Sequence, residues 1–164
     1  MASDGTVCAI ERFKADFSMQ RTRLHGLCSR YRPAAVLAEQ NSIGAPQIQA
    51  LRASGLAVQS WTATNATKHK AVEALSLAFE ESRIKIPDIP NRAALLAELM
   101  NYEASPLPNG MTRFAAAAGG HDDLVIAMML AWAAAHRGRG GWMGPESAGE
   151  GIGNLLVGGG RAWL

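Results

Sequence analysis

The sequence has few cysteines and no long apolar run. Its 164 residues include two cysteines, Cys8 and Cys28, too few for a disulfide framework and without the paired spacing of a zinc site. No run of about 18 apolar residues occurs, so no transmembrane helix is expected. The first residues lack the basic and then apolar layout of an export signal. We therefore expect a protein of a reducing cytoplasm, with no membrane partner.

A strong excess of charge is also missing. Sixteen Lys and Arg residues against fourteen Asp and Glu residues give a net charge of +2, so a case for nucleic-acid binding must come from local clusters. Hydrophobic residues make up 48% of the chain, which is a globular composition. We expect one domain over residues 1–137, followed by a glycine-rich flexible tail over residues 138–164.

The hydrophobic pattern alternates between short strands and amphipathic helices. The apolar run 34–38 is typical of a buried parallel strand, Pro46 suits the first position of a helix that ends near Gly55, and 56–61 is a second strand. Strand, helix and strand form a βαβ unit. Further strands are expected over 6–10, over 83–88 and after the Asn109-Gly110 turn, and further helices over 17–31, 62–81, 91–104 and 119–137.

One carboxylate stands at the end of the first strand of this unit. Ligand sites of open α/β sheets form outside the carboxyl ends of the strands, where Glu39 is placed. The plain alternative is an exposed residue at a strand terminus.

Two further carboxylates, Asp122 and Asp123, open the last apolar helix. Capping explains one of them. A second adjacent carboxylate, preceded by His121 and a glycine pair, exceeds what capping needs, and the two charges repel unless a cation lies between them. Carboxylates from a strand end and a helix start suit Mg²⁺ or Mn²⁺, ions that act on phosphodiesters.

Basic residues gather at another helix start. Lys68, His69 and Lys70 fall in the first turns of a helix, where the macrodipole disfavours positive charge. A phosphate backbone across this end would offset the cost. Equally, the lysines could point into water.

Several segments together resemble a known family. "VLAEQNSIG", "GLAVQSWTATNATKHKAVEALSLAFEE", "IKIPD" and "GGHDDLVIAMMLAWA", in this order, are similar to the C-terminal nuclease domain of the large terminase subunit of tailed bacteriophages. The resemblance covers roughly residues 4–136. It implies an RNase H-like α/β fold, with a mixed sheet flanked by helices. It also implies a metal-dependent endonuclease that cuts double-stranded DNA during genome packaging in the bacterial host cytoplasm, with the portal protein and the small terminase subunit as further partners.

The resemblance assigns roles to individual residues. Glu39, Asp122 and Asp123 match the catalytic, metal-binding acids, and Asp4 matches an accessory metal ligand. The predicted DNA-binding residues are Lys68, which matches a phosphate contact of the family, His121, which belongs to the acidic motif, and Lys70 from the basic helix start described above.

Three departures from the family pattern open an alternative. The primary aspartate of the first strand is absent, the N-terminal hairpin region is shortened, and no G-x-x-x-x-G-K-[ST] loop of an ATPase motor occurs. Because a lost ligand weakens a metal site, the alternative function is a catalytically silent DNA-binding or assembly remnant of a prophage terminase.

Overall fold

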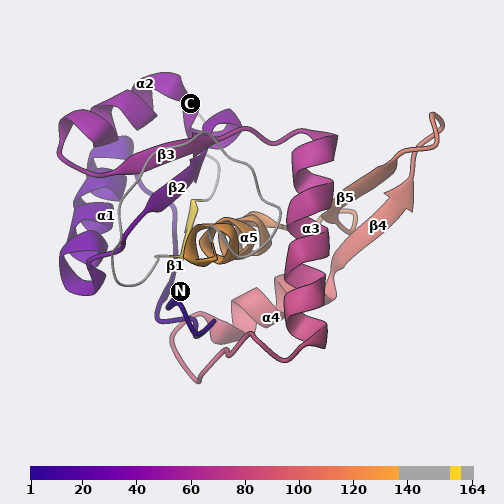
Figure 1. The fold of residues 1–164 in the computed structure, drawn as a ribbon. Coiled ribbons are helices and arrows are strands. Elements are labelled where there is room, and N and C mark those ends of the chain that lie inside the picture. Colours follow the sequence, from indigo (N-terminus) through magenta and orange to yellow (C-terminus); the bar gives the residue numbers. More distant parts are fainter. Residues whose placement is uncertain (137–155, 160–164) are drawn as a thin grey trace.

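The computed structural model describes residues 1–136 and 156–159, which form alternating helices and short strands (Figure 1). In chain order the elements are β1 (Ile10–Phe13), α1 (Phe17–Tyr31), β2 (Val36–Glu39), α2 (Gln40–Ala53), β3 (Val58–Trp61), α3 (Asn65–Glu80), α4 (Arg92–Met100), β4 (Tyr102–Pro106), β5 (Thr112–Ala116), α5 (Asp123–Ala135) and β6 (Leu156–Gly159). The expected α/β class is thereby confirmed.

The strands pair in three two-stranded sheets within this described part. β2 and β3 are parallel, with Glu39 opposite Trp61, and α2 connects them, so the predicted βαβ unit is confirmed. β1 pairs in parallel with β6, and β4 and β5 form an antiparallel hairpin. One continuous mixed sheet is therefore not formed among these strands.

Local chemistry sets the helix ends. The Asp16 carboxylate accepts a hydrogen bond from the Met19 N–H and starts α1, which covers the predicted residues 17–31. Thr64 and Thr67 form a reciprocal capping box at the start of α3. α2 begins earlier than Pro46 because two helical segments join across a kink at Gly44, whose φ of 76° suits glycine.

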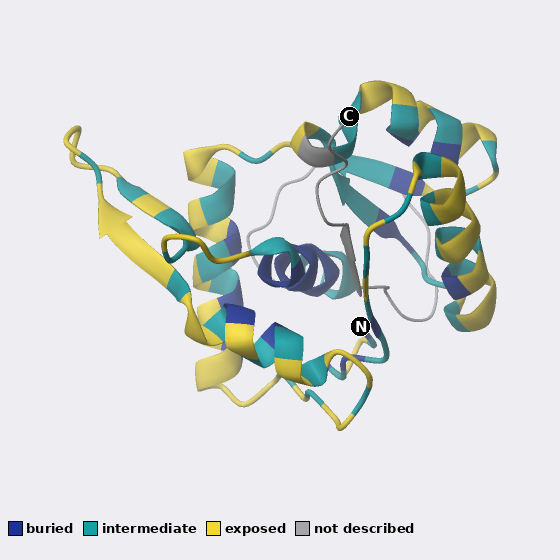
Figure 2. Ribbon diagram, turned by 180° about the vertical axis from the view of Figure 1, so that it is seen from behind, coloured by how far each residue is buried: buried dark blue, intermediate teal, exposed yellow. Residues whose placement is uncertain are grey.

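The core surrounds α5. Residues Leu124 to Trp132 of this helix are all buried, and a helix that is apolar on every side must lie inside the protein (Figure 2). It packs against α3, α4, β2 and β6. A second, smaller apolar cluster joins β2 and β3 to α2 through Val36, Ile48, Leu51 and Val58.

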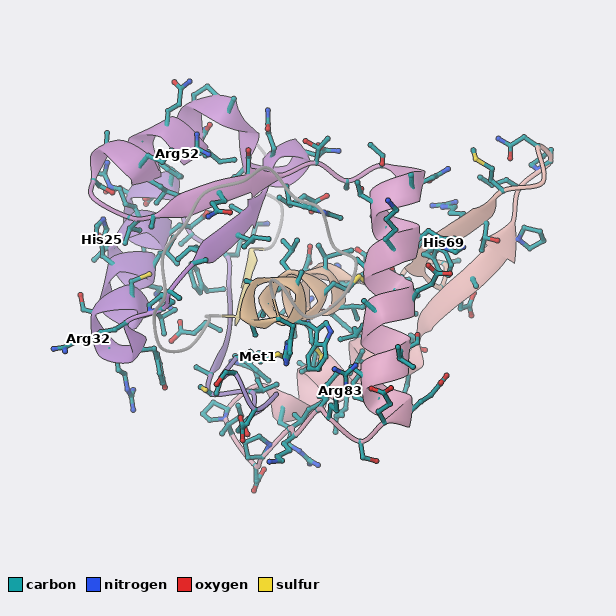
Figure 3. The ribbon with its side chains drawn as sticks, in the orientation of Figure 1. Met1, His25, Arg32, Arg52, His69 and Arg83 are labelled. Carbon is teal, nitrogen blue, oxygen red and sulfur yellow. The ribbon has the colours of Figure 1, made fainter. Side chains whose placement is uncertain are left out.

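Polar and aromatic contacts tie the outer elements together (Figure 3). A ring nitrogen of His25 in α1 lies 2.8 Å from the Ser54 hydroxyl, after α2. The Arg52 guanidinium donates to the Val58 carbonyl. On the other side of α5, the His69 ring meets the edge of Phe114 at 5.3 Å between centroids, which joins α3 to the hairpin.

Several expected elements differ from those observed. The first strand lies at 10–13 rather than 6–10, and residues 83–88 contribute an isolated bridge between Thr6 and Lys85 rather than a strand. α4 ends at Met100, and residues 102–104, expected in that helix, belong to β4. In the predicted flexible tail, residues 156–159 form β6, and the rest of 138–164 lies outside the described residues. None of the described helices is long and apolar enough to cross a membrane.

Candidate functional site

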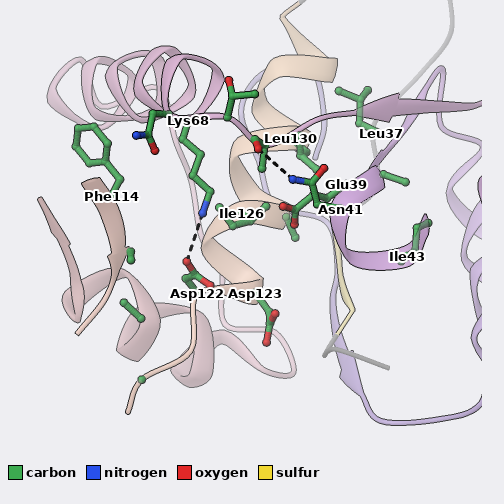
Figure 4. Close-up of a pocket in the computed structure, with 18 of the residues that line it drawn as sticks. Leu37, Glu39, Asn41, Ile43, Lys68, Phe114, Asp122, Asp123, Ile126 and Leu130 are labelled. Carbon is green, nitrogen blue, oxygen red and sulfur yellow. Dashed lines mark hydrogen bonds and ion pairs between the residues drawn. The ribbon is translucent and has the colours of Figure 1, made fainter. Parts of the chain in front are cut away.

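A pocket of about 730 Å³ lies where the starts of three helices meet. Its lining includes the first residues of α2, α3 and α5 and the small residues at the end of β5. β1 and α1 contribute a further side, made of Phe13, Phe17, Gln20, Arg21 and Leu24. The polar side chains of the lining that concern the site are Glu39, Asn41, Lys68, Asp122 and Asp123 (Figure 4). The three helix starts direct the positive ends of their macrodipoles toward this region.

Glu39 reaches the pocket because β2 ends there. It is the last residue of the strand and the N-cap position of α2, but its side chain makes no capping hydrogen bond. Two residues later the Asn41 amide donates to the Ala63 carbonyl at 3.0 Å, which fixes the start of α2 against the segment before α3. The strand end and the α3 start are thus held side by side.

Asp122 and Asp123 enter the pocket from the start of α5. Asp122 occupies the N-cap position without a side-chain capping bond. The N–H of Leu124 is instead capped from another helix, since Oε2 of the buried Glu98 in α4 accepts it at 2.7 Å. The capping alternative for Asp122 is therefore not what the structure contains.

Lys68 crosses from α3 to this acidic side. Its Nζ lies 3.9 Å from Oδ2 of Asp122, and both side chains are about three-quarters covered, at 24% and 28% exposure (Figure 4). An ammonium in the first turn of a helix is disfavoured by the macrodipole, and the carboxylate opposite offsets that cost.

Tyr102, the first residue of β4, lies close to the same acids. Its hydroxyl is buried and has no hydrogen-bond partner within the described residues. Burial, and then the charges of Asp122 and Glu39, raise the pKa of this phenol far above its usual range. The two carboxylates therefore act on one buried hydroxyl, although they are far apart in the sequence.

Three of the predicted site residues lie elsewhere. Asp4 does not line the pocket: its carboxylate accepts hydrogen bonds from the Thr6 N–H and hydroxyl and pairs with Lys85 at 3.2 Å. These bonds, the Thr6 N–H first, lower the pKa of Asp4 to about 2. Lys70 and His121 are exposed and also lie outside the lining. The structure thus groups Glu39, Asp122, Asp123 and Lys68 but not the other three.

Sequence reasoning missed two residues. Glu98 had a visible signal, because it follows the buried Leu95 by three residues on the apolar face of a short helix. Tyr102 had none, since the strand that carries it was expected to be helix.

The donor set suits a hard divalent cation. Carboxylate oxygens favour Mg²⁺, Mn²⁺ and similar ions over soft metals. Even so, no three His, Cys, Asp or Glu side chains among the described residues stand close enough together to hold an ion as they are. In this arrangement the Asp122 carboxylate forms an ion pair with the ammonium of Lys68.

Comparison with known proteins gives consistent relatives. No family model matches the chain. It is 28% identical over 130 residues to the large terminase subunits of Thermus phage G20c and Thermus virus P23-45, a match that covers 78% of this chain but 26% of each relative. The chain therefore spans about a quarter of the length of these proteins.

Solved structures extend the likeness to the fold. The large terminase nuclease of thermophilic phage G20c matches with a TM-score of 0.66 and 26% identity over 74% of this chain and 64% of that one. Its structure with bound magnesium matches at 0.63, and the structure with bound cobalt at 0.64, each with 28% identity over 73% of this chain and 62% of that chain. In sequence and in fold, the chain is similar to the nuclease domain of bacteriophage large terminase subunits, as its sequence motifs indicate.

Proposed function

We propose that this chain is a metal-dependent endonuclease domain of the terminase type, which cuts double-stranded DNA during phage genome packaging. The observation that carries the proposal is the convergence of Glu39, Asp122 and Asp123 on one pocket from a strand end and a separate helix start. The metal-bound nuclease of phage G20c, to which the chain is similar, supports a divalent ion at such a site.

The proposed roles follow from position and charge. Glu39, Asp122 and Asp123 would hold Mg²⁺ or Mn²⁺. When bound, a divalent cation supplies the charge that stabilises the attacking and leaving oxygens of a phosphodiester. Lys68 and the three helix starts would favour a DNA phosphate at the mouth of the pocket. The exposed Lys70 and His121 would meet the DNA outside it.

The finer structural and cellular assignments belong to the same proposal. The fold is RNase H-like with a shortened N-terminal region, in which β1 leads through three residues directly into α1. The proposed DNA cleavage takes place in the bacterial host cytoplasm, with the portal protein and the small terminase subunit as partners. Asp4, held by Thr6 and Lys85, would have to leave those partners to act as an accessory ligand.

Plasmid cleavage tests this function. Purified protein should relax or linearise supercoiled plasmid with Mn²⁺ or Mg²⁺, and EDTA should stop the reaction. Glu39→Gln should abolish cutting, whereas Glu80→Gln removes the same charge from the exposed far end of α3 and should not. Intact plasmid over a wide range of metal and protein concentrations, or equal cutting by Glu39→Gln, would overturn the proposal.

One observation favours a second candidate, a silent DNA-binding or assembly module. β1 carries no aspartate, and the described carboxylates do not form a three-ligand group. Such a module would bind DNA in a salt-sensitive manner without cutting it. Filter binding and cleavage measured in the same buffer separate the two functions.

A further inference from the structure

Lys68 contacts the acidic pocket in a way that DNA contact alone does not require. Its side chain runs from the first turn of α3 into the pocket and ends at Asp122 rather than at the surface (Figure 4). With 24% exposure it is mostly covered, whereas Lys70, two residues on, is exposed and does not line the pocket. One of the two neighbouring lysines is thus built into the acidic site.

The charges explain why an ammonium should stay there. Asp122 and Asp123 are adjacent, and Glu39 lines the same pocket, so like charges that repel one another gather there. The lining also carries Arg21 and Arg113, but the cation that pairs with Asp122 is Lys68. Capping does not hold Asp122 in place, because Glu98 already accepts the Leu124 N–H. The Lys68 ammonium, 3.9 Å away, is the cation that the structure places opposite this carboxylate.

We propose that Lys68 is the built-in counter-ion of this pocket: it neutralises Asp122 while no metal is bound, and a divalent cation must displace it to bind. Lys68 thereby sets the metal affinity of the site and limits occupancy at low metal concentration. The proposal rests on the proposed function, since it takes the same carboxylates as metal ligands.

Metal binding, measured without DNA, tests this role. Mn²⁺ alone is titrated into the protein, and free Mn²⁺ is followed by electron paramagnetic resonance. Because partly exposed ion pairs are weak, Lys68→Met should tighten Mn²⁺ binding by about two- to five-fold, while Lys68→Arg should stay close to the unmodified protein. Lys70→Met is the matched control, because it removes the same charge from the same helix outside the pocket.

Thermal unfolding in EDTA gives a second readout. Without its counter-ion, the metal-free pocket should be less stable, so Lys68→Met should melt at a lower temperature than Lys70→Met. Saturating Mn²⁺ should remove the difference, because the ion then supplies the missing charge.

Each outcome decides the question. If Glu39→Gln weakens Mn²⁺ binding but Lys68→Met behaves like Lys70→Met, the counter-ion role is overturned and the nuclease proposal stands. If Mn²⁺ binds to Lys68→Met but not to the unmodified protein, the counter-ion role is supported and the nuclease proposal fails for the native chain. Absence of binding in every variant overturns both.

Discussion

Replacing Glu98 should destabilise the fold more than replacing any of the pocket acids. The carboxylate is 6% exposed and holds two elements at once. Oε2 accepts the Leu124 N–H of α5, and Oε1 lies 3.2 Å from Arg12 Nη1 of β1, an ion pair without hydrogen-bond alignment. Glu98 in α4 therefore joins β1 to the start of the central helix.

The size of the effect follows from these contacts. Glu98→Gln keeps an acceptor for the Leu124 N–H but removes the negative charge. The hydrogen bond then becomes weaker by about 1 kcal/mol, and the favourable interaction of the carboxylate with the positive end of α5, worth about 1 kcal/mol, is lost. Arg12 is 33% exposed, so its pair adds less than about 1 kcal/mol, and relief of carboxylate burial offsets part of the loss. We expect a net loss of about 1–3 kcal/mol. Glu98→Ala also removes the acceptor of the Leu124 N–H, and while that donor stays unsatisfied the variant should cost about 3–5 kcal/mol.

Urea unfolding followed by circular dichroism measures both variants. Arg12→Met and the double variant with Glu98→Gln complete a cycle that isolates the ion pair. If the unfolding free energies of Glu98→Gln and Glu98→Ala both fall within about 0.5 kcal/mol of the unmodified protein, as surface substitutions do, Glu98 does not hold β1 and α5 together.

Two pH-dependent effects should follow from the shifted groups. The hydrogen bonds from Thr6 and the ion pair with Lys85 lower the pKa of Asp4 from its ordinary value of 3.8 to about 2. These interactions therefore stabilise the fold when the pH is above 3.8, and their contribution is lost as the pH falls through about 2. The stability difference between the unmodified protein and Asp4→Asn, measured by urea unfolding, should therefore be present at pH 7 and shrink between pH 4 and pH 2. A constant difference would contradict it. The raised pKa of Tyr102 acts in the opposite direction, so its contribution is complete below the ordinary value of 10.0 and is lost as the pH rises beyond it. Ultraviolet titration of tyrosinate should show this phenol ionising at lower pH in Asp122→Asn, and an unchanged curve would contradict the proximity of that carboxylate.

Local patterns in the sequence were enough to locate the pocket acids. The apolar run before Glu39 and the turn residues after it mark a strand end, and Asp122 and Asp123 directly precede a helix that is apolar on every side. Helix starts and strand ends depend mainly on neighbouring residues. Asp16 illustrates this, because the Met19 N–H that its carboxylate caps lies only three residues away in the sequence.

Contacts between distant segments could not be predicted in this way. β1 lies at Ile10–Phe13 because it pairs with β6, nearly 150 residues later, and the glycines of β6 resemble a linker more than a strand. The helix expected to reach residue 104 stops at Met100, since Tyr102 pairs with Ala116 across the hairpin. In sequence Asp4 resembles a site residue. In the structure its carboxylate pairs with Lys85, the residue that forms the isolated β-bridge with Thr6.

Glu98 also accounts for the direction in which Asp122 faces. An aspartate at an N-cap normally accepts the N–H that Glu98 takes here, that of Leu124. Glu98→Ala frees the Leu124 N–H. If the Asp122 carboxylate then accepts this N–H and caps α5, its pair with Lys68 is loosened. The tightening of Mn²⁺ binding caused by Lys68→Met should then be smaller in Glu98→Ala than in Glu98→Gln, which keeps a capping oxygen. Equal tightening in both backgrounds, with both variants folded, would show that capping by α4 does not control the acid that faces the pocket.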